Sequence, residues 1–307
     1  MKTKITNLQI LILLLTVSFV WLAQPALPQS VTSDARPNDH IKTDSRILYH
    51  DGPVMVGASS AYVIWYGCWD NTCGPVGDAG TQSIVSDFLL NVGASPYFQI
   101  LAGYPNGNGQ GPSGSLLFGG IVADPYSHGL ELTAADIQEI VADQITSQHL
   151  PPDPSGIYLV LASADVSSPT TGFCVASTQP HHGTGFANGS QFKYAFVGNP
   201  TRCPSVAAPQ FFVNGTLLPT PNGSFAADGM VNNLAHVLNT TITNPTSTGW
   251  FDRYGLQNAD KCDQQFGPTY LTNTGARANI KLGQRDYLIQ QNWINSGKGH
   301  CALNTSL

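Results

Sequence analysis

His236 is the side chain best placed for chemistry, because it lies on a predicted helix that spans about Asp228 to Thr243. Apolar residues at helical spacing give this helix a core-facing stripe, formed by Val231, Leu234, Ala235, Leu238 and Ile242. His236 and Thr240 stand four residues apart and share the other side, which we expect to face a cleft. Zinc hydrolases use this spacing in H-E-x-x-H, where two histidines hold the ion and the glutamate activates water. Here Val237 and Thr240 occupy the glutamate and second-histidine positions, so a structural role for His236 is the plainer interpretation.

Carboxylates and aromatic rings offer two further chemistries. A carboxylate pair would serve glycoside hydrolysis, and its candidates are Asp70, Asp78, Asp228 and Asp260. Exposed rings would form a sugar-binding platform, and its candidates are Trp65, Tyr66, Trp69 and Tyr104. Such aspartates more often shape turns, and such rings more often pack inside. A carbohydrate-binding module therefore stays an alternative.

The start of the chain has the pattern of a secretory signal. Two lysines precede an apolar run from Leu8 to Leu22, and small and turn-forming residues follow. This run is shorter than the roughly 20 residues that span a bilayer. We therefore expect residues 1–29 to be a signal peptide, residues 30–50 a flexible tether and residues 51–307 one domain. The mature protein is expected to have no membrane span and to be secreted, extracellular or periplasmic.

Composition excludes one large class of partner. Charged residues make up 10% of the chain and the net charge is −6, so no basic stripe is present to neutralise nucleic-acid phosphates. The hydrophobic content of 42% is enough for a core, and 31 glycines and 21 prolines indicate many turns. These numbers describe a globular chain with a neutral polar surface.

Six cysteines follow the predicted signal, and an even number in an oxidising compartment predicts three disulfides. Spacing alone leaves 15 pairings open. We favour pairing between nearest neighbours in the chain, namely Cys68–Cys73, Cys174–Cys203 and Cys262–Cys301. The spacing is too scattered for a cysteine metal site.

Strand and helix patterns alternate along the chain and predict an α/β layered fold. Apolar and β-branched runs predict strands at 61–67, 115–122, 156–163, 192–198 and 287–293. Helical spacing predicts helices at 81–92, from Thr133 to just before Pro151, and at 228–243. Thr133 and Asp136 have the spacing of a capping box at the start of the second helix.

The chain resembles the EXORDIUM family, the phosphate-induced proteins of plant cell walls and their bacterial relatives. The resemblance covers nearly all of the mature chain. It rests on AYVIWYG, SIVSDFLLNV, GFC followed by HHG, YAFVGN, TRCP, PNGSFAADGMVNNLAHVL and TITNP. It implies a protein that acts at the cell surface or wall in growth-related processes, with a polysaccharide or a surface protein as partner.

A weaker resemblance links AHVLNTTITNP to the SHELAEAITDP segment of secreted zinc peptidases. It implies a zinc-peptidase-like (zincin-like) fold, in which His236 is kept and Asp260 matches an acidic position. Gln257 stands where a glutamate is expected, and His182 is a third candidate metal ligand. We therefore expect a non-catalytic protein with a degenerate site and no cofactor. A zinc-dependent hydrolase that uses His236 is the alternative.

Five asparagines fit the N-x-S/T pattern of glycosylation acceptors. They are Asn188, Asn214, Asn222, Asn239 and Asn304. The pattern matters only where the host glycosylates exported proteins.

Overall fold

A mixed five-stranded sheet is the centre of the computed structural model, which describes residues 46–69, 79–175 and 181–305. Its strands are β2 (Gly57–Tyr66), β3 (Pro112–Asp124), β4 (Gly156–Ala162), β5 (His181–Ala187) and β6 (Ser190–Val197). Their order is β3-β2-β4-β6-β5. Four strands run parallel, and β5 pairs antiparallel with β6 at one edge. The predicted α/β class is thus confirmed as a mixed sheet with helices.

The apolar runs in the sequence form the inner strands. Every residue of β4 is buried, which fits a strand covered on both faces. β5 was not predicted, because its sequence HHGTGFA has two glycines and only one β-branched residue. It is held by pairing with β6 across the turn at Asn188 and Gly189, whose φ angles of 51° and 76° suit a two-residue hairpin.

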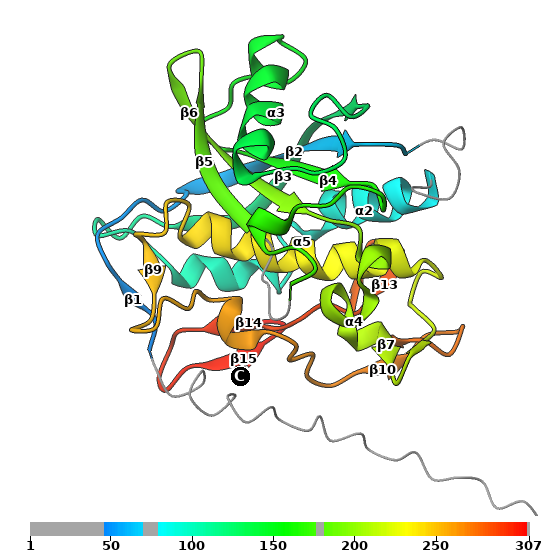
Figure 1. Cartoon of the computed structure of the whole chain (residues 1–307). Coiled ribbons are helices and arrows are strands. Elements are labelled where there is room, and N and C mark those ends of the chain that lie inside the picture. The colour runs from blue at the N-terminus through cyan, green and yellow to red at the C-terminus, as the bar shows by residue number, and fades with distance from the viewer. Residues whose placement is uncertain (1–45, 70–78, 176–180, 306–307) are drawn as a thin grey trace, which may run out of the picture. The chain divides into compact units, whose positions relative to one another are not determined.

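Helices cover both faces of the sheet, as Figure 1 shows. The helix α3 (Ala134–Thr146) packs on one face, and α5 (Phe225–Thr243) with α2 (Ala79–Val92) packs on the other. The capping box is present, since the Thr133 side chain accepts from Asp136 N and the Asp136 side chain accepts from Thr133 N. Short helical segments fill the connections: α4 (Pro204–Ala207), η1 (Phe98–Gly103), η2 (Pro169–Thr171), η3 (Pro200–Arg202), η4 (Pro209–Phe211) and η5 (Asp260–Cys262).

The helix α5 begins earlier than predicted and is more deeply buried. Ser224 caps it by accepting from Ala227 N at 3.2 Å, so the helix starts at Phe225 rather than Asp228. Leu234 and Leu238 are fully buried, as the apolar stripe predicted. From Ala227 to Thr243, however, every residue except Asn233 is buried, so the helix has no solvent-facing polar side.

The C-terminal part of the chain covers the far side of α5 with short two-stranded ladders (Figure 1). These strands are β10 (Tyr270–Leu271), β11 (Arg277–Ala278), β12 (Ile280–Leu282), β13 (Arg285–Tyr287), β14 (Asn292–Ile294) and β15 (His300–Ala302). A further hairpin is formed by β7 (Phe212–Val213) and β8 (Thr216–Leu217).

The predicted strand at 287–293 is wrong. β13 ends at Tyr287 and β14 begins at Asn292. Between them Gln290 N donates to Asn232 Oδ1 of α5 at 2.7 Å, so a helix side chain rather than a neighbouring strand satisfies this backbone. The apolar run looked like a strand because it is buried, not because it is paired.

The segment expected to be a tether is ordered where it is described. Ile47 is fully buried, and β1 (Leu48–Tyr49) pairs with β9 (Trp250–Phe251). The expected signal peptide and residues 30–45 lie outside the described residues. Among the described helices, none is long and apolar enough to cross a membrane.

Between described cysteines two disulfides are formed, and both join nearest neighbours in the chain as we favoured. Cys174 bonds Cys203, and Cys262 bonds Cys301. The third expected pair, Cys68–Cys73, includes Cys73, which lies outside the described residues.

Candidate functional site

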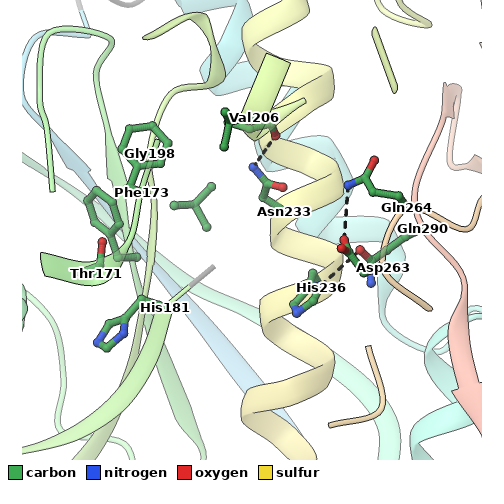
Figure 2. Close-up of a pocket in the computed structure, with 13 residues that line it drawn as sticks. Thr171, Phe173, His181, Gly198, Val206, Asn233, His236, Asp263, Gln264 and Gln290 are labelled. Atoms are coloured by element: carbon green, nitrogen blue, oxygen red, sulfur yellow. Dashed lines mark hydrogen bonds between the residues drawn. The ribbon is translucent and has the colours of Figure 1, made fainter. Parts of the chain in front are cut away.

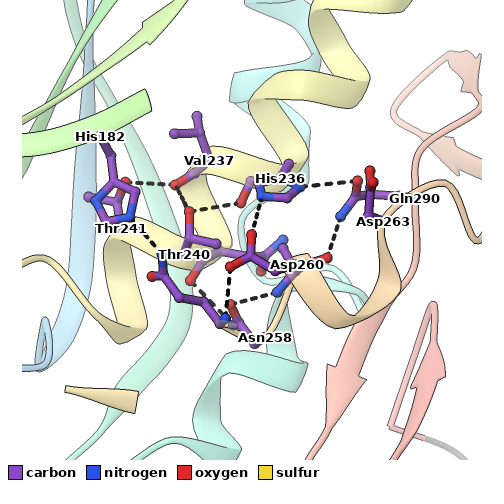
Figure 3. Close-up of polar contacts among 12 residues, drawn as sticks. His182, His236, Val237, Thr240, Thr241, Asn258, Asp260, Asp263 and Gln290 are labelled. Carbon is purple, nitrogen blue, oxygen red and sulfur yellow. Dashed lines mark hydrogen bonds and ion pairs between the residues drawn. The ribbon is translucent and has the colours of Figure 1, made fainter. Parts of the chain in front are cut away.

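The side of α5 that carries His236 is buried against two C-terminal segments (Figure 3). His236 Nε2 lies 2.9 Å from Asp260 Oδ1, and His236 Nδ1 lies 3.1 Å from Gln290 Oε1. Gln290 Nε2 donates to Ala259 O at 3.0 Å, which directs its oxygen toward the imidazole. Both ring nitrogens of His236 therefore face acceptors.

The geometry and the pKa shifts agree on a charged pair. Burial opposes charge on both residues, but the hydrogen bond and the attraction between them outweigh it. The pKa of His236 is raised despite burial, because Asp260, Asp263 and Gln290 favour the imidazolium. The pKa of Asp260 is lowered despite burial, because His236 and the Gln257 backbone favour the carboxylate. With both ring nitrogens directed at hydrogen-bond partners, the imidazole presents no free nitrogen to a metal in this arrangement.

His182 reaches this pair only through Gln257. Asp260 Oδ2 accepts from Gln257 N at 2.8 Å, and Gln257 Nε2 lies 3.2 Å from His182 Nε2. Within the described residues, His182 Nδ1 and Gln257 Oε1 are buried without a hydrogen-bond partner. Burial lowers the pKa of His182 to about 4, so its ring is neutral at pH 7.

The two positions of α5 that correspond to the base and the second ligand hold Val237 and Thr240. Val237 belongs to the apolar core between α5 and the sheet. The hydroxyl of Thr240 donates to the backbone oxygens of His236 and Val237 at 3.3 and 3.1 Å, and that of Thr241 donates to Val237 O at 2.6 Å. Neither position that would hold a base or a second ligand presents a group to a metal.

A narrow cleft opens beside His236, between α5 and the edge of the sheet (Figure 2). Its volume is about 40 Å³, enough for a few water molecules at most. His181 and Phe173 lie on the sheet side, and Asn233 and His236 lie on the helix side. The ring of Phe173 lies over Gly198, where any Cβ would stand 2.3 Å from the ring.

The structure brings two of the three candidate metal ligands together. His236 contacts Asp260, and His182 comes near them through Gln257 rather than directly. Metal binding by these residues stays a prediction. Gln290 was missed, because nothing in its sequence context separates a buried amide from an exposed one. The only described group of histidine and carboxylate ligand atoms close enough for a metal ion lies elsewhere, at His128, Asp136 and Glu139.

The structure also places the residues proposed for a sugar-binding platform and for a carboxylate pair. The four aromatic candidates are buried, with at most 6% exposure, so they form no exposed sugar platform. Among the carboxylates, Asp228 accepts from Asn222 at the start of α5, whereas Asp260 pairs with His236. Asp70 and Asp78 lie outside the described residues.

Comparison with known proteins finds a matching family and several similar plant proteins. Residues 47–295 match the family described as the phosphate-induced protein 1 conserved region. The chain is 30% identical to protein EXORDIUM-like 3 of Arabidopsis thaliana over 281 residues, which cover 81% of this chain and 80% of that protein. It is 34% identical to protein EXORDIUM-like 5 of the same plant over 226 residues, covering 67% and 59%. Protein PHOSPHATE-INDUCED 1 of Nicotiana tabacum is 30% identical over 226 residues, 67% of each chain. No solved structure matches this chain significantly.

Proposed function

This chain belongs to the phosphate-induced protein 1 family, which includes EXORDIUM-like proteins, and we propose that it is a secreted, non-catalytic member that acts at the cell surface or wall in growth-related processes. Two disulfides support export, since they persist in oxidising compartments. The start of the sequence supports it as well, because it has the pattern of a signal peptide. The partner we propose is a wall polysaccharide or a surface protein.

The contacts of both His236 ring nitrogens carry the non-catalytic part of the proposal. A catalytic zinc site needs about three protein ligands with free lone pairs and a base to take a proton from bound water. His236 gives hydrogen bonds to Asp260 and Gln290 through both nitrogens. The structure thus uses this residue to fasten α5 to the C-terminal part of the chain. We propose that any peptidase ancestry of this helix survives only as a scaffold.

One observation favours a metal-dependent hydrolase as the second candidate. The Nδ1 atom of His182 is buried and has no partner among the described residues. A buried polar atom without a partner often marks a site for water or an ion. For a metal to use His182 and His236 together, however, one ring nitrogen of His236 would have to leave its present partner, either Asp260 or Gln290.

Metal content and proteolysis together test the proposal. We expect the purified mature protein to carry well under one equivalent of zinc and to leave casein and generic peptides uncut. The measurements are elemental analysis and a protease assay with and without a chelator. Stoichiometric zinc, with chelator-sensitive cleavage that disappears in His236→Ala, would establish the hydrolase instead.

Retention on wall material tests the proposed partner. The mature protein is incubated with insoluble wall polysaccharide, and the bound fraction is compared with that of an unrelated secreted protein of similar net charge. Specific retention identifies polysaccharide as the partner. Retention equal to that of the control protein leaves a surface protein as the partner to seek.

A further inference from the structure

Asn239 has the sequence of a glycosylation acceptor but the surroundings of a core residue. It precedes Thr240 and Thr241, which completes the N-x-T pattern, and it is fully buried on α5. Its Nδ2 donates to Tyr97 Oη at 2.9 Å and to Ala235 O at 2.6 Å. Both hydrogens of this amide are therefore used inside the protein.

The acceptor oxygen of Asn239 is also used. Asn239 Oδ1 accepts from Asn292 Nδ2 at 2.9 Å, and its backbone oxygen accepts from Asn258 Nδ2 at 3.3 Å. Tyr97, Asn258 and Asn292 are all fully buried. This amide cluster joins α5 to the first residue of β14 and to the segment after β9, so it forms part of the tertiary structure.

A glycan on Asn239 cannot be accommodated in this fold. Transfer from a lipid diphosphate-linked oligosaccharide joins Asn Nδ2 to the anomeric carbon, breaks the bond from that carbon to the diphosphate and releases the amide proton. The modified amide keeps one hydrogen, so one of the two bonds to Tyr97 and Ala235 is lost. The sugar itself would have to lie in a closely packed interior, where even a few extra methylene groups are destabilising.

Asn222 is the second acceptor in conflict with the fold. Its Nδ2 donates to Asp228 Oδ1 at 2.7 Å and to Asp286 O at 3.0 Å. These bonds tie the start of α5 to β13, and Ser224 of the same acceptor sequence caps the helix. Modification at Asn222 would therefore loosen the helix at its first turn.

The other acceptors show what compatible positions look like. Asn188 and Asn214 are exposed and lie in the tight turns of the β5–β6 and β7–β8 hairpins, with φ angles of 51° and 50°. Asn304 is also exposed. Glycans at the two hairpin tips would extend into solvent.

The disulfides set a second requirement on the compartment in which the chain folds. Cys174–Cys203 and Cys262–Cys301 require an oxidising environment. We propose that this chain folds in an oxidising compartment that does not transfer N-linked glycans, as a bacterial periplasm or exterior does not. The inference rests on the proposed secretion and specifies its route.

Expression in two hosts tests the proposal. The full chain with its own N-terminus is expressed in a bacterial host that lacks N-glycan transfer. Residues 30–307 behind a host secretion signal are expressed in a eukaryotic secretory host. Thr241→Val removes the acceptor pattern at Asn239 while keeping Asn239 and the side-chain volume, and Thr216→Val removes the exposed pattern at Asn214 as the matched control.

We expect folded wild-type and Thr241→Val protein from the bacterial host. In the eukaryotic host we expect wild-type chain to be glycosylated at Asn239 and retained in cells. Thr241→Val or an inhibitor of lipid-linked oligosaccharide synthesis should raise secretion several-fold, and Thr216→Val should not. Site occupancy is read by mass spectrometry after enzymatic glycan release.

Equal secretion of wild-type and Thr241→Val chains from the eukaryotic host would overturn the proposal, whether or not Asn239 carries a glycan. Equal rescue by Thr216→Val would overturn it too, because the buried position would then have no special role. Failure of the full chain to leave the bacterial cytosol is a separate result. That result contradicts the proposed secretion. It does not affect the comparison of wild-type and variant chains in the eukaryotic host.

Discussion

The helices α3 and α5 pack on opposite faces of one sheet, yet they are stabilised in different ways. α3 buries Ile137, Ile140, Val141 and Ile145 against the sheet and turns its acidic residues outward. α5 is buried nearly all round, and its polar residues bond to the C-terminal part of the chain. An amphipathic helix needs only the sheet, whereas α5 needs a second cover that comes from residues far along the sequence.

Their charged groups differ in the same way. His128, which precedes α3, lies 3.6 Å from Asp136 and 3.7 Å from Asp143 of that helix, and these carboxylates are partly or largely exposed. His236 of α5 and Asp260 of η5 are 2.9 Å apart and buried. Exposed ion pairs contribute little to stability, while breaking a buried pair leaves an uncompensated charge. Mutations on the two helices should therefore have very different effects.

Removing Asp260 should have the largest effect. Asp260→Ala removes the carboxylate partner of the buried His236, and breaking a buried pair typically costs about 3–5 kcal/mol in the free energy of unfolding. Denaturant unfolding monitored by tryptophan fluorescence measures the loss. A cost below about 1 kcal/mol would mean that the pair is not a structural fastening and would weaken the contrast between the helices.

The apolar faces of the two helices should behave alike. Leu238→Ala on α5 and Ile140→Ala on α3 each remove a fully buried side chain, so each should cost about 2–5 kcal/mol. Unfolding midpoints of the two variants give the comparison. An unchanged midpoint for Leu238→Ala would show that the core face of α5 is assigned wrongly.

Acid should destabilise the folded protein through protonation of His182. Its folded pKa of about 4 is below the unfolded value of 6.5, so the unfolded chain binds more protons between these values. Stability from this residue is present above pH 6.5 and is lost as pH falls toward 4, by on the order of 3 kcal/mol. The difference in stability between wild type and His182→Leu, measured from pH 7 to 4.5, should shrink in acid.

His236 provides an internal control for that measurement, because its shift has the opposite sign. The pKa of His236 is raised, so its contribution is present below the unfolded value and is lost as pH rises through the folded value. A His182→Leu difference that grows in acid would contradict the assignment of a buried neutral ring.

The first turns of the two helices should be similar, since both are capped locally. Thr133 accepts from Asp136 N at 3.1 Å, and Ser224 accepts from Ala227 N at 3.2 Å. Thr133→Ala and Ser224→Ala should each cost about 1 kcal/mol. The check is a comparison of thermal unfolding midpoints. If either cap variant lost as much stability as Asp260→Ala, its capping residue would have a role beyond the first turn of the helix.

The smallest effect should come from the surface of α3. The Asp143 side chain is 67% exposed, and its partner atom on His128 is 3.7 Å away. Asp143→Ala should change the free energy of unfolding by no more than about 0.5 kcal/mol. A loss comparable to that of Asp260→Ala would remove the distinction between the two helices.

The sequence by itself determined the elements whose cause is local. The buried strands, the helix α3 with its capping box and the apolar stripe of α5 follow from the spacing and type of neighbouring residues. The family also follows from the sequence, because its motifs run through the whole domain. His236 and Asp260 were named from the sequence as candidate metal ligands, and the contact between them is a finding of the structure.

Only the tertiary structure decided what surrounds those elements. β5 forms because β6 offers it a partner, and residues 288–291 avoid strand pairing because α5 satisfies the Gln290 backbone. The partners of His236, Gln290 and Asp260, come from 54 and 24 residues away. Helical spacing shows which residues share a face, but burial of that face depends on chain that returns from far along the sequence. The polar side of α5 is therefore an interior that only the folded chain reveals.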